Sequence, residues 1–306
     1  MTSSILFHHY PASTFSEKVR VLFGIKRLAW TEVVEPTIMP KPELTVLTGG
    51  YRRIPVLQIG ADIYCDTSVI MSELEHRFPD PKVIHAADWM VNAWADRLLF
   101  QAAVTIIFGT IGEQVPAAFI KDREALSGNS FDLKRMKAAV PDAKGQFRAM
   151  AAWIEQALAG GRSWLGGNAP SLADIASYMN IWFYRSALAQ DCDALLADMP
   201  QLATWRERIS AIGHGTHTSI SPTEAIAAAA AAEPMSAAHI AHDARDAEGL
   251  ARGSAVFVMA NDYGRDPISG TLLAANRERI VIAREHQSVG RVHVHFPRAG
   301  FSLASQ

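Results

Sequence analysis

Cysteine is scarce in this sequence: Cys65 and Cys192 are the only two in 306 residues. They lie far apart, and neither has a second cysteine at C-x-x-C spacing. A disulfide framework and a redox-active pair of thiols on one loop are therefore both disfavoured.

Long apolar runs are also missing. The longest largely apolar stretch, Ala102 to Ile107, is far shorter than the roughly 20 residues that cross a bilayer as a helix. The first residues, Met1 to Ser4, carry neither a basic region nor a sustained apolar segment, so no signal peptide is expected. A reducing cytoplasm is the expected location, and no membrane partner is expected.

Neither sign of charge is in excess. The 29 basic and 31 acidic side chains give a net charge of −2, and the two signs are interspersed along the chain. This balance provides no global attraction to nucleic acid, so a nucleic-acid partner is not expected either. Apolar residues make up 49 % of the chain, which is enough to bury the cores of two or three domains.

The first 80 residues alternate between strand and helix patterns. After Ser16, for example, the apolar residues Val19, Leu22 and Phe23 follow the spacing of a helix face. The order βαβαββα predicts an α/β domain over residues 1–80. Its expected elements are a strand at Ile5–Phe7, a helix from Ser16, a strand at Trp30–Val34, a helix at Lys41–Leu47, a hairpin of Pro55–Ile59 and Asp62–Cys65, and a helix at Ser68–Arg77.

Residues 86–212 are expected to form an all-helical domain. An apolar stripe from Ala86 to Ile111 indicates one long helix, and the helical pattern returns at Ala143–Leu158. Ser171 and Asp174 form an S-x-x-D capping box ahead of a further apolar run.

The pattern changes after Gly213. Residues 213–253 contain a nearly all-alanine stretch, Glu224–Glu233, and are expected to be an Ala-rich helical linker. Residues 254–306 carry short segments typical of strands, which predict a small antiparallel barrel or curled sheet. These segments are Val256–Met259, Thr271–Ala275, Ile280–Ala283 and Val292–Phe296.

Four short motifs follow one another in the α/β region. They are Ser13-Thr14-Phe15-Ser16-Glu17-Lys18-Val19-Arg20, Lys41-Pro42-Glu43, Arg53-Ile54-Pro55-Val56-Leu57 and Asp66-Thr67-Ser68. In this order they resemble the glutathione transferase family. Two later stretches, Ser171–Ile175 and Met199–Ile209, resemble the closing helices of that family's second domain. The resemblance covers Ile5 to Ile212 and implies a thioredoxin-like domain followed by an all-α domain.

The resemblance also implies a binding site for glutathione. Asp66 would receive the γ-glutamyl ammonium, and Thr67, at a helix start, would hold the γ-glutamyl carboxylate. Ile54, before an expected cis bond to Pro55, would pair with the cysteinyl backbone, and Lys41 would reach the glycine end. The family's usual Glu and Ser are replaced here by Asp66 and Thr67.

Ser13 aligns with the catalytic hydroxyl of the serine-type classes. A free thiol has a pKa near about 8.5, so a hydroxyl that donates to the sulfur would favour the reactive thiolate. Ser13 could equally cap the following helix, and Tyr10 and Thr14 are the next candidates for the hydroxyl. No cysteine lies between Ser13 and Ser16, which disfavours a mixed-disulfide mechanism.

Several other polar residues are expected to be solvated. Arg52 and Arg53 are expected to be solvated, with contact to the ligand as the alternative. His293-x-His295 has a spacing compatible with metal binding, but no clustered Cys or carboxylate completes the set, so no metal is expected. A pocket for an apolar co-substrate has four candidate lining residues on the long helix, half of which are expected to be ordinary core: Trp94, Arg97, Phe100 and Phe108.

The function implied by the resemblance is that of a homodimeric transferase. Glutathione would be the co-substrate, and its thiol would attack a small electrophilic, apolar molecule. The alternative is a binding or scaffold protein that keeps the fold without the activity and holds a partner with its C-terminal module, since a fold alone does not decide function.

Overall fold

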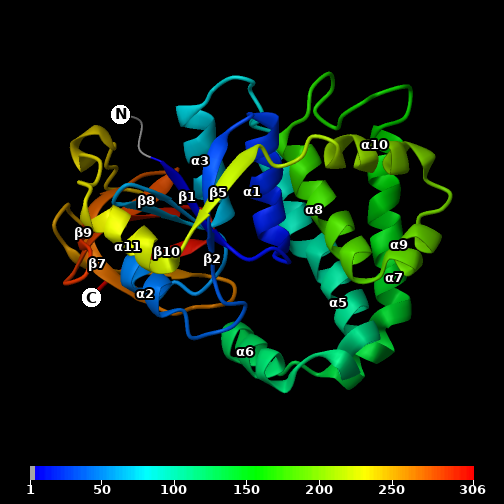
Figure 1. Ribbon diagram of the computed structural model, residues 1–306, viewed down its shortest axis with the longest axis horizontal. Helices are drawn as coiled ribbons and strands as arrows, with labels where there is room; N and C mark the ends of the chain where they lie inside the picture. The colour runs from blue at the N-terminus through cyan, green and yellow to red at the C-terminus, as the bar shows by residue number, and fades with distance from the viewer. Residues whose placement is uncertain (1–3) are drawn as a thin grey trace.

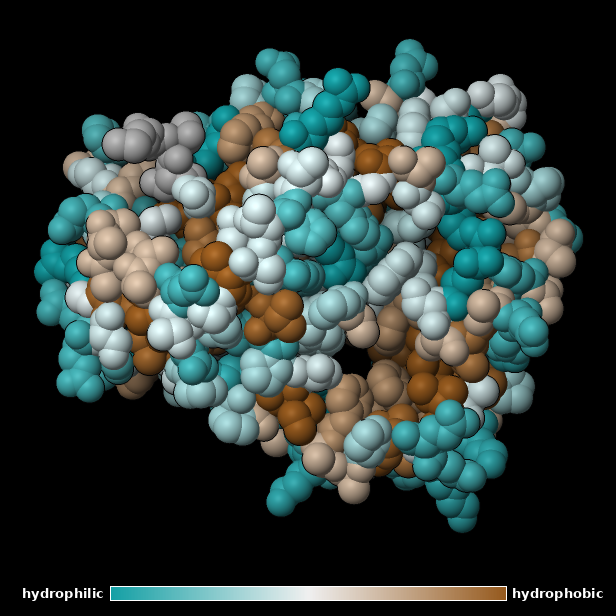
Figure 2. All heavy atoms as spheres, viewed as in Figure 1, coloured by the Kyte–Doolittle hydropathy of each residue, from teal (hydrophilic) through white to brown (hydrophobic). Residues whose placement is uncertain are grey.

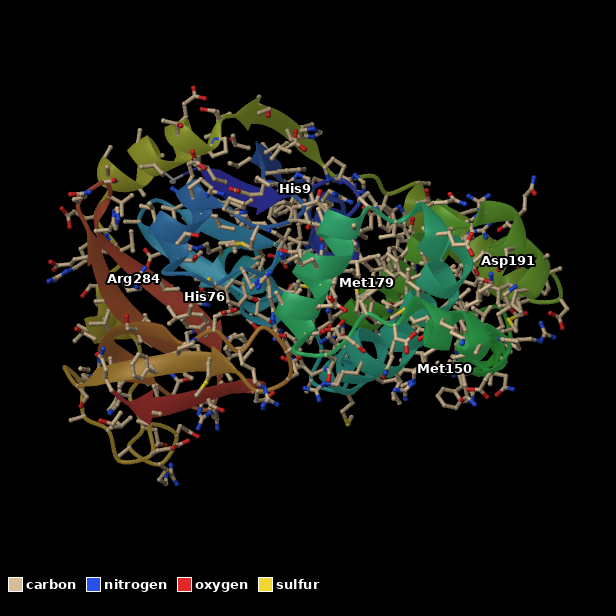
Figure 3. The ribbon with its side chains drawn as sticks, turned by 90° about the horizontal axis from the view of Figure 1, so that it is seen from below. His9, His76, Met150, Met179, Asp191 and Arg284 are labelled. Atoms are coloured by element: carbon tan, nitrogen blue, oxygen red, sulfur yellow. The ribbon has the colours of Figure 1, made fainter. Side chains whose placement is uncertain are left out.

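The computed structural model describes residues 4–306 and confirms the predicted fold classes in their predicted order. A thioredoxin-like α/β domain comes first, a helical domain second and a β-strand module last. In two perpendicular views the thioredoxin-like domain lies between the other two parts (Figures 1 and 3). Met150, Met179 and Asp191 mark the helical domain in Figure 3, and Arg284 marks the C-terminal module.

The thioredoxin-like domain is built on four strands. β1 pairs in parallel with β2 and antiparallel with β3, and β3 pairs antiparallel with β4. The helix-spaced residues Val19, Leu22 and Phe23 are fully buried, as their periodicity indicates. The elements are β1 (Ile5–His9), α1 (Thr14–Ile25), β2 (Ala29–Val34), α2 (Pro42–Thr48), β3 (Val56–Ile59), β4 (Asp62–Cys65) and α3 (Thr67–Arg77).

The helical domain begins with one continuous helical stretch, as predicted, but the stretch contains a π-helical segment that was not predicted. The expected helix over Ala86–Ile111 is divided by a π-helical segment, Ala95–Leu99, between α4 (Asp88–Trp94) and α5 (Phe100–Ile111). The remaining elements are a 3₁₀ turn (Gly112–Gln114), α6 (Ala117–Ser127), α7 (Leu133–Ala157), α8 (Leu172–Ala187), α9 (Ala189–Leu195) and α10 (Pro200–Ser210).

The helical stretch Asp88–Gln114 is long and apolar enough, by length and composition alone, to cross a membrane. It is the one such helix among the residues that the structure describes. In its most apolar window 39 % of the residues are buried, and Leu99, Ile106 and Ile107 belong to the main core of the protein. These three side chains pack the helix against the main core.

The C-terminal module is a curled sheet. β6 (Ala255–Ala260), β7 (Ile268–Ala275), β8 (Arg279–His286) and β9 (Gly290–Pro297) pair antiparallel in sequence order. The last strand, β10 (Phe301–Ser305), pairs with β6, although three residues separate it from β9. The sheet must therefore curl back on itself, in agreement with the predicted small barrel or curled sheet.

The module is not a separate sheet, and this was not predicted. β9 pairs in parallel with β4, so ten strands of the described chain form one continuous sheet in the order β10-β6-β7-β8-β9-β4-β3-β1-β2-β5. The two parts also share a core. It joins Leu44, Val56 and Ile63 of the thioredoxin-like domain with Val256, Ile282 and Phe296 of the module.

The segment expected to be a helical linker also contains a strand. β5 (Thr216–Ile220) pairs in parallel with β2 at the other edge of the sheet, and α11 (Pro222–Ala230) follows it. The helical prediction is wrong for residues 216–220 because their sequence, THTSI, lacks the apolar alternation of a half-buried strand. A short, mostly exposed edge strand gives little sequence signal, and it covers the edge of β2.

The two histidines of β9 are buried, so the expectation that they are solvated is wrong. His295 Nε2 lies 2.8 Å from Asp62 Oδ1, and its ring stacks on Tyr64 with centroids 4.4 Å apart. His293 is buried beside the same carboxylate. The pairing of β9 with β4 places both rings against the thioredoxin-like domain.

Candidate functional site

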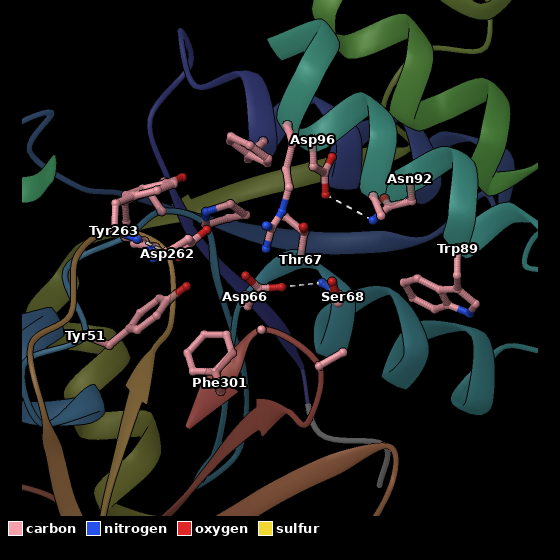
Figure 4. A pocket seen from close by; sticks show the side chains of 18 residues that line it. Tyr51, Asp66, Thr67, Ser68, Trp89, Asn92, Asp96, Asp262, Tyr263 and Phe301 are labelled. Carbon is pink, nitrogen blue, oxygen red and sulfur yellow. Dashed lines mark hydrogen bonds and ion pairs between the residues drawn. The ribbon is translucent and has the colours of Figure 1, made fainter. Parts of the chain in front are cut away.

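A cavity of about 330 Å³ lies where the three parts of the molecule meet (Figure 4). Tyr51, Asp262, Tyr263 and Phe301 lie on one side of the view, and Trp89, Asn92 and Asp96 lie on the other. Asp66, Thr67 and Ser68 lie between them. The remaining lining residues are Phe15, Arg53, Ile54, Pro55, Ala93, Arg97, Ala299 and Gly300.

Four of the residues predicted to bind glutathione line this cavity. The Ile54–Pro55 peptide bond is cis, and Pro55 leads directly into β3. Asp66 has a φ of +92°, a conformation that non-glycine residues rarely adopt. Its carboxylate accepts the amide hydrogen of Ser68 at 2.8 Å and so caps α3, whose first residue is the buried Thr67. Such strained positions cluster at functional sites.

The wall from the helical domain is formed at the π-helical segment. Segments of this kind are frequent at functional sites, and this one carries Asp96 and Arg97. Both carboxylate oxygens of Asp96 accept hydrogen bonds of 2.8 Å from the fully buried Lys18, and Asn92 donates a third at 3.0 Å. Burial raises the pKa of Asp96 despite the neighbouring ammonium.

The third wall comes from the C-terminal module and the loop before β3. Asp262 and Tyr263 lie between β6 and β7, and Phe301 begins β10. The rings of Tyr51 and Phe301 lie 6.4 Å apart. Burial raises the pKa of Tyr263 to about 12 and raises that of Tyr51 well above its usual value, so both phenols keep their protons at neutral pH.

Ser13 does not line the cavity. It is buried at the N-cap of α1, where its Oγ accepts the amide hydrogen of Ser16 at 3.2 Å. Its neighbour Phe15 does reach the cavity, with its ring against Phe100 at a centroid distance of 4.9 Å. The alternative hydroxyls of Tyr10 and Thr14 do not line the cavity either.

Lys41 also lies outside the cavity, in a buried position just before α2. Its Nζ has Met39 Sδ at 4.0 Å as its nearest side-chain partner. Burial lowers the pKa of Lys41, and the Asp122 carboxylate partly opposes that change.

Arg53 is the main residue that the sequence analysis misplaced. It was expected to be solvated, yet its side chain is only 11 % exposed and lines the cavity. The neighbouring Arg52 instead pairs with Asp122 at 2.8 Å. Asp262 and Tyr263 were also missed, although they lie in a stretch dense in turn formers, the kind of loop that often carries functional residues.

The two cysteines offer no nucleophile to the site. Both are buried, and burial raises the pKa of Cys65 well above its usual value and that of Cys192 to about 12. Among residues 4–306, no group of three or more His, Cys, Asp or Glu side chains is placed to hold a metal ion.

A thioredoxin-like domain with a cis-proline before β3 and a capped α3, followed by a helical domain, defines a glutathione S-transferase-like protein. The sequence model "Glutathione S-transferase, N-terminal domain" matches residues 7–82, and a domain of unknown function matches residues 110–216. No curated protein matches the sequence.

Solved structures extend this likeness to the whole chain. A GST-like protein from Pseudomonas syringae has 34 % sequence identity and a TM-score of 0.81, over 99 % of this chain and 100 % of that one. The chain therefore belongs to the glutathione S-transferase-like proteins.

More distant structures share the fold over part of the chain. A glutathione S-transferase from Rhodospirillum rubrum F11 has 21 % identity and FzlA from C. crescentus has 22 %. Each has a TM-score of 0.52 and covers 67 % of this chain and 87 % of its own.

Proposed function

We propose that this protein binds glutathione in the cavity of Figure 4 and activates its thiol for attack on a small electrophilic, apolar molecule. The observation that carries the proposal is the convergence of Ile54, cis-Pro55, Asp66 and Thr67 on one cavity. These are the residues that the sequence resemblance assigns to the tripeptide.

Each end of the γ-glutamyl group has a chemically suitable partner. The carboxylate of Asp66 attracts an ammonium, and the amide groups at the start of α3 favour a carboxylate. Ile54 precedes β3 and lies outside its ladder, so its backbone N–H and C=O can pair with the cysteinyl residue.

Ser13 remains the proposed activating hydroxyl, although it does not itself line the cavity: it stands at the start of α1, two residues before the lining residue Phe15. Its oxygen accepts one hydrogen bond from Ser16, which leaves its own hydrogen to donate to the sulfur. The thiol would lose its proton to solvent, and the sulfur would then form a bond to the electrophilic carbon as the leaving group departs with its electrons.

The apolar nature of the second substrate is proposed from the surroundings of the cavity. Phe15, Trp89 and Ala93 give it apolar lining. Outside the cavity lining, on the face shown in Figure 2, apolar side chains also gather around an opening beside α5 and α6. In this region the ring of Phe108 lies 5.7 Å from that of Phe119 and 5.2 Å from that of Phe131.

Calorimetric titration with glutathione tests binding, with Asp66→Asn as the decisive variant. Asparagine retains the helix cap and tolerates the positive φ, but it removes the charge that faces the ammonium. We expect the affinity to fall about 10- to 100-fold with little change in stability.

The matched control is Asp132→Asn, which alters the exposed cap of α7 in the same way. Wild-type protein that fails to bind glutathione would contradict the proposal, and an unchanged affinity in Asp66→Asn would remove Asp66 from the site.

Loss of free thiol on incubation with an electrophilic aryl halide distinguishes an enzyme from the alternative, a binding protein without catalysis. The cytoplasmic location remains a prediction that cell fractionation would test.

A further inference from the structure

The cavity contains one guanidinium that the C-terminal module holds in place. Arg53 donates from Nη2 to the carboxylate of Asp262, and its Cζ lies 3.9 Å from the centroid of the Tyr263 ring. Both partners are on the loop between β6 and β7, more than 200 residues away in sequence. An ion pair and a cation–π contact together fix the plane of the guanidinium.

The remaining donors of Arg53 are not used by the protein. Its Nε is buried without a hydrogen-bond partner among the described residues, and the only hydrogen bond of the guanidinium within them is made by Nη2. A buried donor without an acceptor is unfavourable, and a guanidinium matches the geometry of a carboxylate. Nε lies against Gly264, whereas Nη1 makes no hydrogen bond within the described residues and is not buried, so Nη1 is the donor left for an acidic ligand group in the cavity.

The loop that carries Asp262 and Tyr263 is anchored on two sides. The amide of Gly264 donates to the carbonyl of Leu126 at the end of α6, at 2.7 Å, and the amide of Asn261 donates to the carbonyl of Gly300 at 3.0 Å. A Cβ at Gly264, whose φ is +58°, would lie only 2.9 Å from Leu126 Cδ1. The loop thus joins the module to the helical domain across the side of the cavity.

We propose that Asp262 and Tyr263 are positioning residues that orient Arg53 to bind the glycine carboxylate of glutathione. This inference rests on the proposed function. Arg53 adjoins Ile54, where the cysteinyl backbone is proposed to pair, while the ammonium end lies at Asp66. Lys41, which the resemblance assigns to the glycine end, lies outside the cavity. The C-terminal module thereby completes the peptide site.

The test compares glutathione with its glycine monoethyl ester, which lacks the glycine carboxylate charge, by calorimetric titration. Wild-type protein should bind glutathione about 10- to 100-fold more tightly than the ester, as expected for a charge-assisted hydrogen bond. Arg53→Met should abolish this preference, and Asp262→Asn should reduce it to within about threefold. The control, Asp266→Asn, removes the same charge from an exposed position in the same loop and should keep the wild-type preference.

Two substitutions at Tyr263 test whether its aromatic ring orients Arg53. Tyr263→Phe keeps the face on which the guanidinium rests and should retain the preference, whereas Tyr263→Leu should lose most of it. If thermal unfolding shows that Asp262→Asn does not fold, the two Tyr263 variants still test the inference.

The outcomes separate the two proposals. Wild-type protein that binds neither ligand overturns both the proposed function and this inference. If the wild type binds glutathione and the ester with equal affinity, only the inference is overturned. The same holds if Asp262→Asn and Asp266→Asn prefer glutathione over the ester to the same degree.

Discussion

The hydroxyl of Ser13 has two roles open to it. As the N-cap of α1 it satisfies the amide of Ser16, a contact worth about 1 kcal/mol of stability. As a donor to a bound thiolate it would contribute roughly 1.5–3 kcal/mol, which corresponds to about one to two pKa units. The two roles therefore differ in what their removal changes.

We expect Ser13→Ala to raise the pKa of bound glutathione by about one to two units while its affinity stays nearly constant. Thiolate absorbance measured against pH reports this shift. Thr14→Val and Tyr10→Phe, which remove the alternative hydroxyls, should leave the titration unchanged. Identical titration curves in wild type and Ser13→Ala would reduce Ser13 to a helix cap.

His9 illustrates how burial couples protonation to stability. The residue lies on β1 (Figure 3), and its ring packs against those of Phe7 and Trp30 at centroid distances of 5.0 and 5.7 Å. Its Nδ1 accepts a hydrogen bond of 3.0 Å from Arg20, and its Nε2 lies 2.9 Å from Glu32. Burial, together with Arg20, lowers the pKa of His9 from 6.5 to about 4, although Glu32 opposes the change.

We expect His9 to make the fold sensitive to mild acid. Between pH 6.5 and about 4 the unfolded chain binds a proton at His9 that the folded chain does not, so stability falls as the pH falls. At pH 5 this loss amounts to about 2 kcal/mol relative to neutral pH. Urea unfolding of His9→Gln at pH 7 and pH 5 should show a loss smaller by about that amount, since Gln does not titrate. An equal loss in both proteins would contradict this account.

At the level of elements, β9 joins the module to the thioredoxin-like domain. Asp62 on β4 accepts from His295 at 2.8 Å through Oδ1 and from the amide of Met235 at 2.7 Å through Oδ2. The side chain of Asp62 is 6 % exposed, so both donors depend on its carboxylate for a partner.

Removing the carboxylate of Asp62 should weaken the packing of the C-terminal module on the thioredoxin-like domain. We expect Asp62→Ala to lower the free energy of unfolding by about 2–4 kcal/mol, because it leaves the buried ring of His295 and the partly buried amide of Met235 without their acceptor. Hydrogen exchange should accelerate along β9 in particular. Glu285→Ala breaks the exposed pair with Arg291 on the same sheet and should change stability by less than about 1 kcal/mol. Similar effects of the two substitutions would argue against the role given to Asp62.

The elements that the sequence predicts correctly are those with local signals. Helical spacing located α1 through Val19, Leu22 and Phe23, and turn residues between two apolar runs located the hairpin of β3 and β4. The pairing of β9 with β4 joins residues about 230 positions apart, and no local pattern records such a partner.

In the candidate site, too, the sequence predicts the residues that belong to local motifs but not those that long-range contacts bring together. Ile54, Pro55, Asp66 and Thr67 belong to short motifs with fixed places in the α/β domain, and they converge on the cavity. The position of Arg53 could not be predicted, because Asp262 and Tyr263 approach it only once the module has joined the sheet.

At the scale of the whole molecule, one surface of the helical domain is unusually apolar. Met90, Trp94 and Leu98 follow one another at four-residue intervals along the first long helical stretch. Met90 is 71 % exposed and Leu98 is 58 % exposed. Trp153 on α7, 57 % exposed, lies against Trp94 at a centroid distance of 5.9 Å. Contiguous exposed apolar side chains of this kind mark interaction surfaces.

We propose that this stripe is the interface of the homodimer that the family resemblance implies. A twofold interface uses the same patch on both subunits, so every substitution in it acts twice.

Light scattering of the wild type at micromolar concentration should give twice the chain mass of 33.4 kDa. Leu98→Glu and Trp153→Glu should each weaken the dimer by at least about tenfold, because each buries an unpaired charge in an apolar interface. The control Val34→Glu places the same charge on an exposed apolar position of β2, away from the stripe, and should remain dimeric. A wild-type mass of one chain would reject the dimer, whereas a dimer that tolerates both glutamates would assign its interface to another surface.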